Sequence, residues 1–377
     1  MEEKKLIKYE GGLVKSVSTA IKVANKLLAL TEPQLIPYRK KDKWGFCTPD
    51  KKIVIDCIYD MAYPFSEGVA KVRSSNAWKF IDKYGKIIFS SDNYLYDFTE
   101  GLAGVWLDSK TGFINKLGNI AVPCIYEEAS DFSEGLAKIQ LYNKSGFCDT
   151  FGKIVIPCIY DNAGSFSEGL AIVELNGKKG FIDKLGNIVI PCIYDSAGSF
   201  SEGLAWVEQN QKYGYIDKQG NVVIPCNVYR DANNFSEGLA SVYEYGFSSG
   251  FIDKQGKIVI PLIYISVNSF SEGLACAFSK QGDSKGGFID KHGNIKIPMI
   301  YDAVCDFSEG LAAIQSDREW GFIDMLGDIV IPCKYIYDGI DHWNCNLIKG
   351  FSNGLAEVEL NGNLGYINKQ GVEYWED

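Results

Sequence analysis

Short stretches of alternating hydrophobic and polar residues fill most of this chain, with a spacing typical of β-strands rather than helices. Residues 169–174 and 180–183 have the pattern of two strands joined by Asn176-Gly177, a favoured two-residue hairpin turn. Residues 187–190 form a third strand of β-branched side chains, which Pro191 ends because proline has no N–H to donate to a sheet. The pattern therefore predicts a small unit of three antiparallel strands.

One phrase, aromatic-Ser-Glu-Gly, recurs at nearly constant intervals, which indicates that this unit is repeated. The nine copies begin at Phe65, Phe98, Phe132, Phe166, Phe200, Phe235, Phe270, Phe307 and Phe351, at steps of 33 to 44 residues. Thr99 replaces the serine of the second copy, and Asn353 replaces the glutamate of the last. We therefore expect residues 37–377 to form an all-β repeat array of about nine repeats, each of about 34 residues.

A three-stranded unit of this size cannot bury its own apolar face, so neighbouring units must cover it. Such an array either runs as an open coil or closes into a ring. Propellers usually have four strands in each blade and about four to eight blades, whereas this chain has three predicted strands and about nine repeats. The sequence therefore favours an open β-solenoid or superhelix, with a propeller-like closed ring as the alternative.

Residues 1–36 lack the repeat and show a helical period instead. The side chains that share one helical face are Leu13, Val14, Val17, Ile21, Ala24, Leu27 and Leu28, and three lysines lie outside this face. We expect an N-terminal α-helix that caps the exposed apolar end of the array. A helix that docks a partner and a helix that lies on a membrane surface are the alternatives.

Several recurring phrases resemble those of the WG-repeat (KWG) family. They include Lys43-Trp44-Gly45-Phe46, Glu319-Trp320-Gly321-Phe322, the run Ile-Asp-Lys-x-Gly-x-Ile-Val-Ile-Pro-x-x-Tyr-Asp and the phrase Phe-Ser-Glu-Gly-Leu-Ala. The resemblance extends over about residues 37–377 and implies a β-rich repeat domain of a bacterial protein, without catalytic residues. Most Trp-Gly pairs of the family signature have lost their tryptophan here, so this residue cannot be a binding feature in most repeats.

The charge balance argues against one large class of partners. The formal net charge is −10 and the pI is about 5.0, whereas nucleic-acid binding needs a basic face. No stretch reaches the roughly 18 apolar residues of a membrane span. Lysines also interrupt the apolar run of residues 11–30, so we expect no membrane partner and no secretory signal.

The eleven cysteines follow the repeat. One repeat position, just after the third strand, holds Cys57, Cys124, Cys158, Cys192, Cys226 and Cys333, and a second holds Cys47 and Cys148. Equivalent positions lie a whole repeat apart and no CxxC pair occurs, so we interpret these residues as small buried side chains rather than disulfides or metal ligands. Free thiols indicate a reducing compartment, and we expect a cytoplasmic protein.

Acidic residues also recur once per repeat. The phrase supplies Glu67, Glu100, Glu134, Glu168, Glu202, Glu237, Glu272 and Glu309, and the second turn supplies Asp82, Asp183, Asp217, Asp253, Asp290 and Asp324. Repeated carboxylates suggest acid–base chemistry or a stripe of cation sites, but a turn also has open N–H groups that such side chains accept from. Eight equivalent active sites in one chain would be exceptional, so we expect turn stabilisation, no catalytic residue and no cofactor.

The tip of the first hairpin differs in every repeat, and variable loops of repeat arrays commonly lie on the binding face. Candidate partner-binding anchors in or beside these tips are Trp106, Tyr142, Trp206, Tyr243 and Tyr245. His342 and Trp343, in the longest interval between phrases, complete the candidate set. An ordinary loop is favoured there over a metal or catalytic site, because neither His342 nor His292 has partners at motif spacing.

Nothing in the repeated phrases is a reaction centre, so an enzyme is the least favoured class of function. The leading hypothesis is a non-catalytic interaction scaffold that binds a protein partner through an extended repeat surface. The second is a cell-envelope or carbohydrate-binding repeat protein, whose aromatic rings would stack on sugars. That hypothesis requires export of the chain and exposed rings at equivalent positions.

Overall fold

The computed structural model describes residues 34–244, 248–280, 284–336 and 350–377. Every helix or strand assigned within these ranges is a β-strand, so the all-β prediction is confirmed for them. The helix predicted over residues 1–36 falls almost wholly outside the described residues, and Ile36 already belongs to the first strand.

A complete unit is a sheet of four strands, one more than the sequence predicts. β17 (Leu170–Leu175), β18 (Lys178–Asp183) and β19 (Ile188–Tyr194) are the predicted strands of one unit. The additional strand, β16 (Asn162–Ala163), pairs Ala163 with Val173 of β17. The three-strand prediction is wrong because a two-residue strand is too short to show a periodic pattern.

The same strand order recurs along the chain. The further short inner strands are β4 (Met61–Ala62), β8 (Leu95–Thr99), β12 (Glu128–Ala129), β20 (Ser196–Ala197), β24 (Asp231–Ala232) and β31 (Ala303–Val304). The second position of this order is held by β1 (Ile36–Lys40), β5 (Ala70–Ser74), β9 (Leu102–Leu107), β13 (Leu136–Leu141), β21 (Leu204–Gln209), β25 (Ala240–Glu244), β28 (Leu274–Ser279), β32 (Leu311–Ser316) and β35 (Leu355–Leu360).

Their hairpin partners are β2 (Lys43–Cys47), β6 (Ala77–Ile81), β10 (Lys110–Asn115), β14 (Lys144–Asp149), β22 (Lys212–Asp217), β26 (Ser248–Ile252), β29 (Gly286–Asp290), β33 (Glu319–Asp324) and β36 (Asn363–Asn368). The outer strands are β3 (Ile53–Tyr59), β7 (Ile87–Ser91), β11 (Ile120–Tyr126), β15 (Ile154–Tyr160), β23 (Val222–Tyr229), β27 (Ile258–Val267), β30 (Ile295–Tyr301) and β34 (Ile329–Tyr335). β27 serves as the outer strand of one unit and the inner strand of the next, which fuses two units into one seven-stranded sheet.

The register between the outer strand and its hairpin partner contains β-bulges. The close approach of the two backbones explains a recurring glycine, and the edge position of the outer strand explains a recurring proline. A Cβ atom at Gly180 of β18 would lie 2.5 Å from the carbonyl oxygen of Ile190 in β19, so only glycine fits there. Pro191 does not end the outer strand, contrary to the prediction, because β19 continues to Tyr194. The proline is tolerated because β19 lies at the edge of its sheet, where no further strand needs an N–H group.

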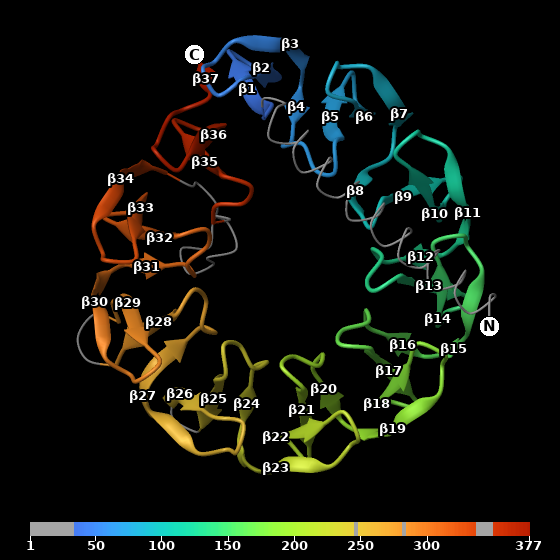
Figure 1. Cartoon of the computed structure of the whole chain (residues 1–377), viewed down its shortest axis with the longest axis vertical. Coiled ribbons are helices and arrows are strands. Elements are labelled where there is room, and N and C mark those ends of the chain that lie inside the picture. The colour runs from blue at the N-terminus through green and yellow to red at the C-terminus, as the bar shows by residue number, and fades with distance from the viewer. Residues whose placement is uncertain (1–33, 245–247, 281–283, 337–349) are drawn as a thin grey trace, which may run out of the picture.

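The units surround a central opening, with the short strands towards the opening and the long outer strands on the circumference (Figure 1). β37 (Trp375–Glu376) pairs in parallel with β1, so the C-terminal end of the chain completes the first sheet. In the part of the chain that the structure describes, nine sheets, one of which spans two units, thus form a closed ring of ten units. The open array favoured by the sequence is wrong, because the strand that closes the ring is supplied by residues far from β1 and has no periodic signal.

The hydrophobic cores lie between units, as expected for units too thin to bury their own faces. Phe181 and Ile190 of one unit pack with Phe200 and Val207 of the next. The rings of Phe181 and Phe200 lie 4.9 Å apart in an edge-on arrangement of 63°. The core at the closure combines buried residues between Ile36 and Ile81 with Leu355, Tyr366 and Tyr374, so the last unit covers the first.

Candidate binding surfaces

The repeated Ser-Glu-Gly phrase forms a tight turn in which two residues have left-handed backbone angles. Ser167 and Leu170 exchange backbone hydrogen bonds across the turn, at 2.9 and 3.2 Å. Glu168 has a φ of 53° and Gly169 a φ of 89°, and a type I′ turn requires positive φ at both positions. A glutamate seldom adopts this conformation, so its recurrence indicates a compensating interaction.

That interaction is made with the next unit around the ring. The carboxylate of Glu134 accepts a hydrogen bond from the amide of Gly169 at 3.1 Å and pairs with Lys184 Nζ at 3.0 Å. The hydroxyl of Ser133 donates to the carbonyl oxygen of Phe166 at 2.8 Å. The other glutamate–glycine contacts of this kind are Glu67–Gly101, Glu100–Gly135, Glu168–Gly203, Glu202–Gly238, Glu237–Gly273, Glu272–Gly310 and Glu309–Gly354. We call this series of contacts the inter-unit belt.

The glutamate carboxylates stabilise turns, as predicted. Each one, however, accepts a hydrogen bond from the turn of the following unit rather than from its own turn. The hydrogen bond from Lys184 holds the pKa of Glu134 below its ordinary value, although partial burial acts in the opposite direction. A carboxylate held ionised by two neighbours is a poor general base, and the contacts of the belt join neighbouring units.

The aspartates of the second turn stabilise that turn locally, as predicted. Asp183 Oδ1 accepts hydrogen bonds from the amides of Leu185 and Asn187, both at 2.9 Å. The same pair of contacts recurs at Asp82, Asp217, Asp253, Asp290 and Asp324. These carboxylates therefore stabilise the turns in which they lie.

A second series of contacts joins the hairpin tips, which lie at the other end of the strands from the belt. Asp161 accepts a hydrogen bond from the amide of Asn176 in the next tip at 2.6 Å and pairs with Lys144 Nζ at 2.5 Å. Asp60, Asp195 and Asp302 link neighbouring tips in the same way. At these joints the variable tips therefore lie side by side on one face of the ring.

The sequence-predicted anchors do not converge on one site. Tyr142 is 88% exposed at a hairpin tip, and Trp106 is 46% exposed near the end of β9. Trp206 is partly buried against Tyr213 and Gly198. The hydroxyl of Tyr243 donates to the carbonyl oxygen of Val267 at 2.8 Å. These four residues belong to four different units, and Trp106 and Tyr142 are the more exposed rings among them.

Tyr245, His342 and Trp343 lie outside the described residues. Within residues 34–244, 248–280, 284–336 and 350–377, no cluster of His, Cys, Asp and Glu side chains could hold a metal ion. The ten cysteines in these ranges are free thiols, and burial raises the pKa of Cys148 to about 12. The predicted burial is complete for Cys47 and Cys148 and partial for those that follow the outer-strand proline. No helix in these ranges is suited to crossing a membrane.

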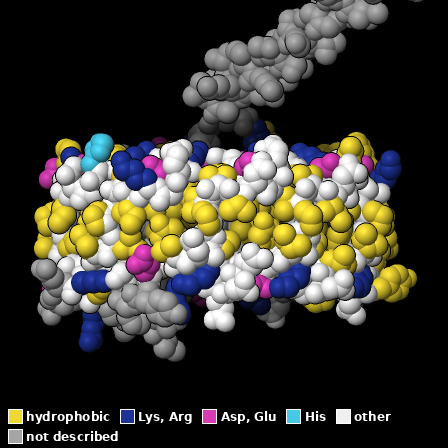
Figure 2. Space-filling model, turned by 90° about the horizontal axis from the view of Figure 1, so that it is seen from below, with side chains coloured by type: hydrophobic (Ala, Val, Ile, Leu, Met, Phe, Trp, Pro, Cys, Tyr) yellow, Lys and Arg dark blue, Asp and Glu magenta, His cyan; other side chains and the backbone are white. Residues whose placement is uncertain are grey.

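Figure 2 shows an apolar band on the side of the outer wall that is in view, between two rims that carry charged side chains. The band consists of exposed side chains of the outer strands, namely Ile53, Val54, Ile58, Ile87, Ile120, Ile125, Ile154, Ile159, Ile188, Val189, Ile193, Val222, Val223, Val228, Ile258, Val259, Ile263, Ile295, Ile300, Ile329 and Val330. Sequence reasoning missed this surface. The signal was the nearly continuous Ile-Val-Ile run, which is also typical of a strand buried on both faces.

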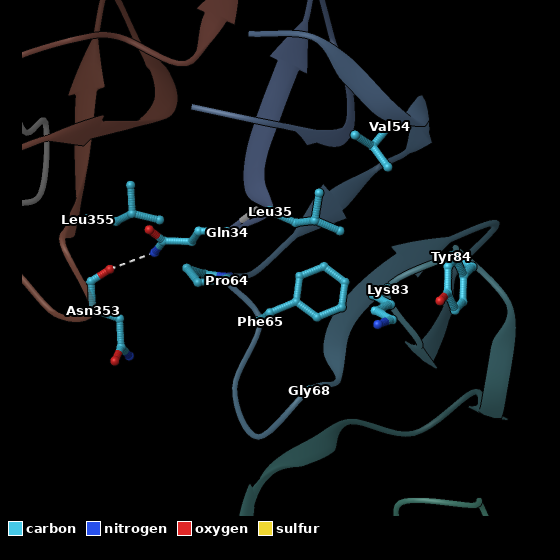
Figure 3. A pocket seen from close by; sticks show the side chains of 10 residues that line it. All are labelled: Gln34, Leu35, Val54, Pro64, Phe65, Gly68, Lys83, Tyr84, Asn353 and Leu355. Carbon is cyan, nitrogen blue, oxygen red and sulfur yellow. Dashed lines mark hydrogen bonds between the residues drawn. The ribbon is translucent and has the colours of Figure 1, made fainter. Parts of the chain in front are cut away.

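The seam, as we call the region where the unit of β1 meets the last unit on one side and the unit of β5 on the other, has a different surface from the other joints. Gln34 donates from its side chain to the carbonyl oxygen of Asn353 at 2.8 Å. Beside this contact lies a pocket of about 430 Å³ whose apolar wall includes Leu35, Phe65 and Leu355 (Figure 3). Phe65 is partly exposed here, whereas Phe200 at an ordinary joint is 1% exposed.

A family model of the WG containing repeat matches residues 44–78, 112–144, 146–178, 180–213, 213–246, 250–278, 287–318 and 320–363. The chain belongs to the WG-repeat family. The resemblance carried by the recurring phrases is thus confirmed over most of the WG-repeat array, including repeats that have lost the signature tryptophan.

No curated protein is a significant match to this WG-repeat chain. Similar solved structures include a eukaryotic initiation factor, with 10% identity, a TM-score of 0.49 and coverage of 91% of this chain and 95% of that chain. BamB from Moraxella catarrhalis has 12% identity and a TM-score of 0.37, and the match covers 83% of this chain and 92% of that chain. Hsv2 from Kluyveromyces lactis has 8% identity and a TM-score of 0.34, with 75% and 93% covered.

The tryptophans that remain from the WG-repeat signature are packing residues at two of three positions. Trp44 and Trp320 are 8% and 7% exposed, and Trp44 packs edge-on against Tyr366 at 5.7 Å across the closure. Trp78 is partly exposed and packs edge-on against Tyr94, whose ring also contacts the ammonium of Lys71. Trp44 and Trp320 therefore stabilise the joints of the ring instead of forming an exposed surface.

Proposed function

We propose that this WG-repeat ring is a non-catalytic scaffold that binds a protein partner through the apolar band on its outer wall. The observation that supports the proposal most strongly is the band itself, with side chains such as Ile159 and Ile193 at 56% and 50% exposure. Contiguous apolar patches of more than a few hundred Å² are uncommon on monomeric proteins and mark interaction sites. Covering these side chains would remove apolar surface from water, which is the main driving force of association.

The band favours side-chain packing over strand pairing as the mode of contact. Outer strands such as β15 and β19 are sheet edges, where an additional strand could pair with the backbone. Pro157 and Pro191 interrupt these edges, and proline at an edge prevents such pairing. The partner would therefore present its own apolar side chains to the band. A standard interface uses about 20–30 residues a side, which an arc of several units can supply.

The chemistry of the band also favours a protein partner over a carbohydrate. Its side chains are aliphatic, whereas sugars stack on exposed aromatic rings. Among the described residues, Tyr142 and Trp106 are exposed at unrelated repeat positions. Tyr84 and Phe151 share one exposed turn position, but leucine stands there in other repeats, at Leu117, Leu185 and Leu326. The regular spacing of the cysteines, which keeps equivalent thiols a repeat apart, supports the cytoplasmic location that belongs to this proposal.

The test replaces part of the band with polar side chains of similar shape. The variant carries Ile154→Thr, Ile159→Thr, Ile188→Thr and Ile193→Thr, and the matched control carries Leu117→Thr, Leu185→Thr and Leu326→Thr at exposed turn positions outside the band. A partner is first captured by cross-linking in the native host and identified. Titration with the purified partner should then show affinity reduced at least about tenfold for the band variant and unchanged for the control.

Circular dichroism must first show that both variants are folded. Unchanged affinity of the band variant contradicts the proposal, and so does a wild-type ring that captures no specific partner. Sedimentation velocity adds a further outcome. If the wild-type ring self-associates and the band variant is a monomer, a second copy covers the band and the proposed separate partner is wrong.

A further inference from the structure

A second pocket lies at the seam, on the face of the ring that carries the hairpin tips. Its volume is about 310 Å³, and its lining residues come from the last, first and second units. Lys41 and Gly362, which belong to the tips of the first and last units, are among them. The two pockets at the seam share no described lining residue, so we call this one the tip-side pocket.

Aromatic rings and carboxylates meet in the tip-side pocket. Trp44, Tyr63 and Tyr366 line it, and the rings of Trp44 and Tyr366 lie 5.7 Å apart in an edge-on arrangement of 76°. Asp60 and Glu357 line it as well. The face of an aromatic ring attracts a cation and a carboxylate pairs with one, so this set of side chains suits an organic cation.

The positive charges in the wall of this pocket are offset by acidic neighbours. Arg39 is 5% exposed, pairs with Asp377 at 2.7 Å and donates to the carbonyl oxygen of Leu364 at 2.9 Å. Lys41 is followed in the chain by Asp42, which also lines the pocket. The basic residues of the wall therefore do not give the pocket a net positive charge.

The two other carboxylates of the pocket differ in what they accept. Asp60 pairs with Lys43 at 2.6 Å, so its charge is balanced within the first units. Glu357 accepts a hydrogen bond from the neutral hydroxyl of Tyr366 at 3.0 Å, which leaves its negative charge in place. Because a carboxylate has about four acceptor sites, Glu357 can accept from a bound cation in addition to Tyr366.

The neighbouring joint shows an ammonium held by the same kinds of group. Lys71 is 4% exposed, and its Nζ pairs with Asp97 at 2.7 Å. The ring centroids of Tyr63 and Tyr94 lie 4.9 and 4.5 Å from this nitrogen, and that of Trp78 lies 6.0 Å away. Burial acts to lower the pKa of Lys71, but the hydrogen bonds with Asp97 and Tyr94 outweigh it and raise the pKa. The buried ammonium therefore stays charged among the rings.

The repeat register connects this arrangement with the tip-side pocket. Trp44 holds the repeat position of Trp78, and Tyr63 both contacts the ammonium of Lys71 and lines the pocket. The position of Lys71 is held in the first unit by Pro37, which carries no charge. The first unit thus has the tryptophan of the arrangement without the lysine at that position.

An ordinary unit offers a matched comparison. Its pocket of about 160 Å³, between β16, β17 and β18, is lined by residues that include Ile172, Glu174 and Lys179. The described lining of that pocket contains a carboxylate but no aromatic ring. Rings and a carboxylate therefore occur together in the tip-side pocket and not in its ordinary counterpart.

We propose that the tip-side pocket binds a primary alkylammonium group, either of a free small molecule or at the end of a lysine side chain of a partner protein. The ammonium pairs with Glu357 and packs against the rings of Trp44 and Tyr63. This site is separate from the outer band, and each can fail without the other.

The probes are Nα-acetyl-lysine amide and its neutral analogue Nα-acetyl-norleucine amide. Calorimetric titration of the full-length protein should show saturable binding of the lysine probe and at least about tenfold weaker binding of the norleucine probe. Glu357→Gln should weaken binding of the lysine probe by about tenfold, and Trp44→Phe should weaken it less. The matched variant Glu174→Gln should leave the affinity unchanged, because its pocket has no ring.

Two further probes distinguish the sources of the ammonium. Butylammonium represents a free small cation, and the peptide Gly-Gly-Lys-Gly-Gly with blocked ends represents a side chain of a partner. Binding of the peptide at least as tight as that of butylammonium supports a partner's lysine. Tighter binding of butylammonium supports a free small molecule.

Three outcomes contradict the proposal. They are absence of saturable binding of the cationic probes, equal binding of the lysine and norleucine probes, and equal affinity of the wild type and the Glu357→Gln variant. Circular dichroism must show that each variant is folded, and the comparison of the two probes on the wild type needs no variant. The band variant should keep binding of the lysine probe, which separates failure here from failure of the outer-wall proposal.

Discussion

An ordinary joint and the seam differ in the polar contacts that join their units. At the joint between Glu134 and Gly169, the carboxylate, the amide and Lys184 all come from the chain itself. At the seam, Gly68 holds the repeat position of Gly169, and none of the glutamate–glycine contacts between described residues reaches its amide. Among the described residues, the belt therefore consists of eight such contacts, from Gly101 to Gly354.

The comparison shows that the joints of one ring are held by different polar contacts. Each unit buries its apolar face only against a neighbour, so every joint must be formed for the ring to be stable. At an ordinary joint the repeated phrase supplies the polar contact, whereas at the seam the side chain of Gln34 donates to the backbone oxygen of Asn353.

The largest difference in stability between the two joints is expected when the aromatic residue of the phrase is removed. Phe200→Ala removes a ring that is 1% exposed and should lower the free energy of unfolding by about 3–5 kcal/mol. Phe65→Ala at the seam removes a partly exposed ring and should cost less than half as much. Urea unfolding followed by circular dichroism measures both, and equal losses would show that the seam is packed like any other joint.

A smaller contrast is expected from the acidic position. Glu134→Ala removes the acceptor of the Gly169 amide and the partner of Lys184, which should cost about 1 kcal/mol. At the seam the backbone oxygen of Asn353 accepts from Gln34, so Asn353→Ala should leave the unfolding midpoint almost unchanged. A loss at Asn353 as large as that at Glu134 would indicate that the last phrase continues the belt through its side chain.

Acid should weaken the ordinary joints through their carboxylates. Hydrogen bonding lowers the folded-state pKa of Glu134, and the pKa values of Glu168, Glu237 and Glu309 are lowered as well. A lowered folded pKa gives stability that is fully present above the unfolded glutamate pKa of about 4.3 and is lost as pH falls through the folded values. The urea midpoint should therefore stay level near neutral pH and fall below about pH 4.5.

The Glu134→Gln variant is the control for this dependence. Glutamine keeps an acceptor for the Gly169 amide but cannot be protonated in this range, so the variant should show a slightly smaller loss of stability in acid. A midpoint that stays level to pH 3, or an identical acid loss in the variant, would contradict the part assigned to the belt.

The sequence predicts the unit far better than the assembly. The strands predicted within residues 169–190, the turn role of Asp183 and the family all follow from local pattern, because each rests on residues close together in the chain. The short strand β16 and the parallel pairing of β37 with β1 could not be predicted, since neither has enough residues to show a period. The destination of Glu134 was missed for a related reason, because its partner Gly169 lies 35 residues away in another unit.

The candidate surfaces also differ in how far local sequence pattern predicts them. Aromatic residues such as Trp106 and Tyr142 stand out in a sequence one at a time, but the ring places them in separate units. The apolar band and the seam pocket depend on which strand lies outermost and on which units meet at the closure. Both facts are properties of the closed ring, so local pattern alone does not predict them.

The most direct measurement is hydrogen exchange at the glycine amides of the nine phrases, followed by NMR on protein labelled at glycine. The account predicts slow exchange at the eight amides that bind a glutamate, from Gly101 to Gly354, and faster exchange at Gly68. Exchange at Gly68 as slow as at the other eight amides would contradict the distinction between the seam and the ordinary joints.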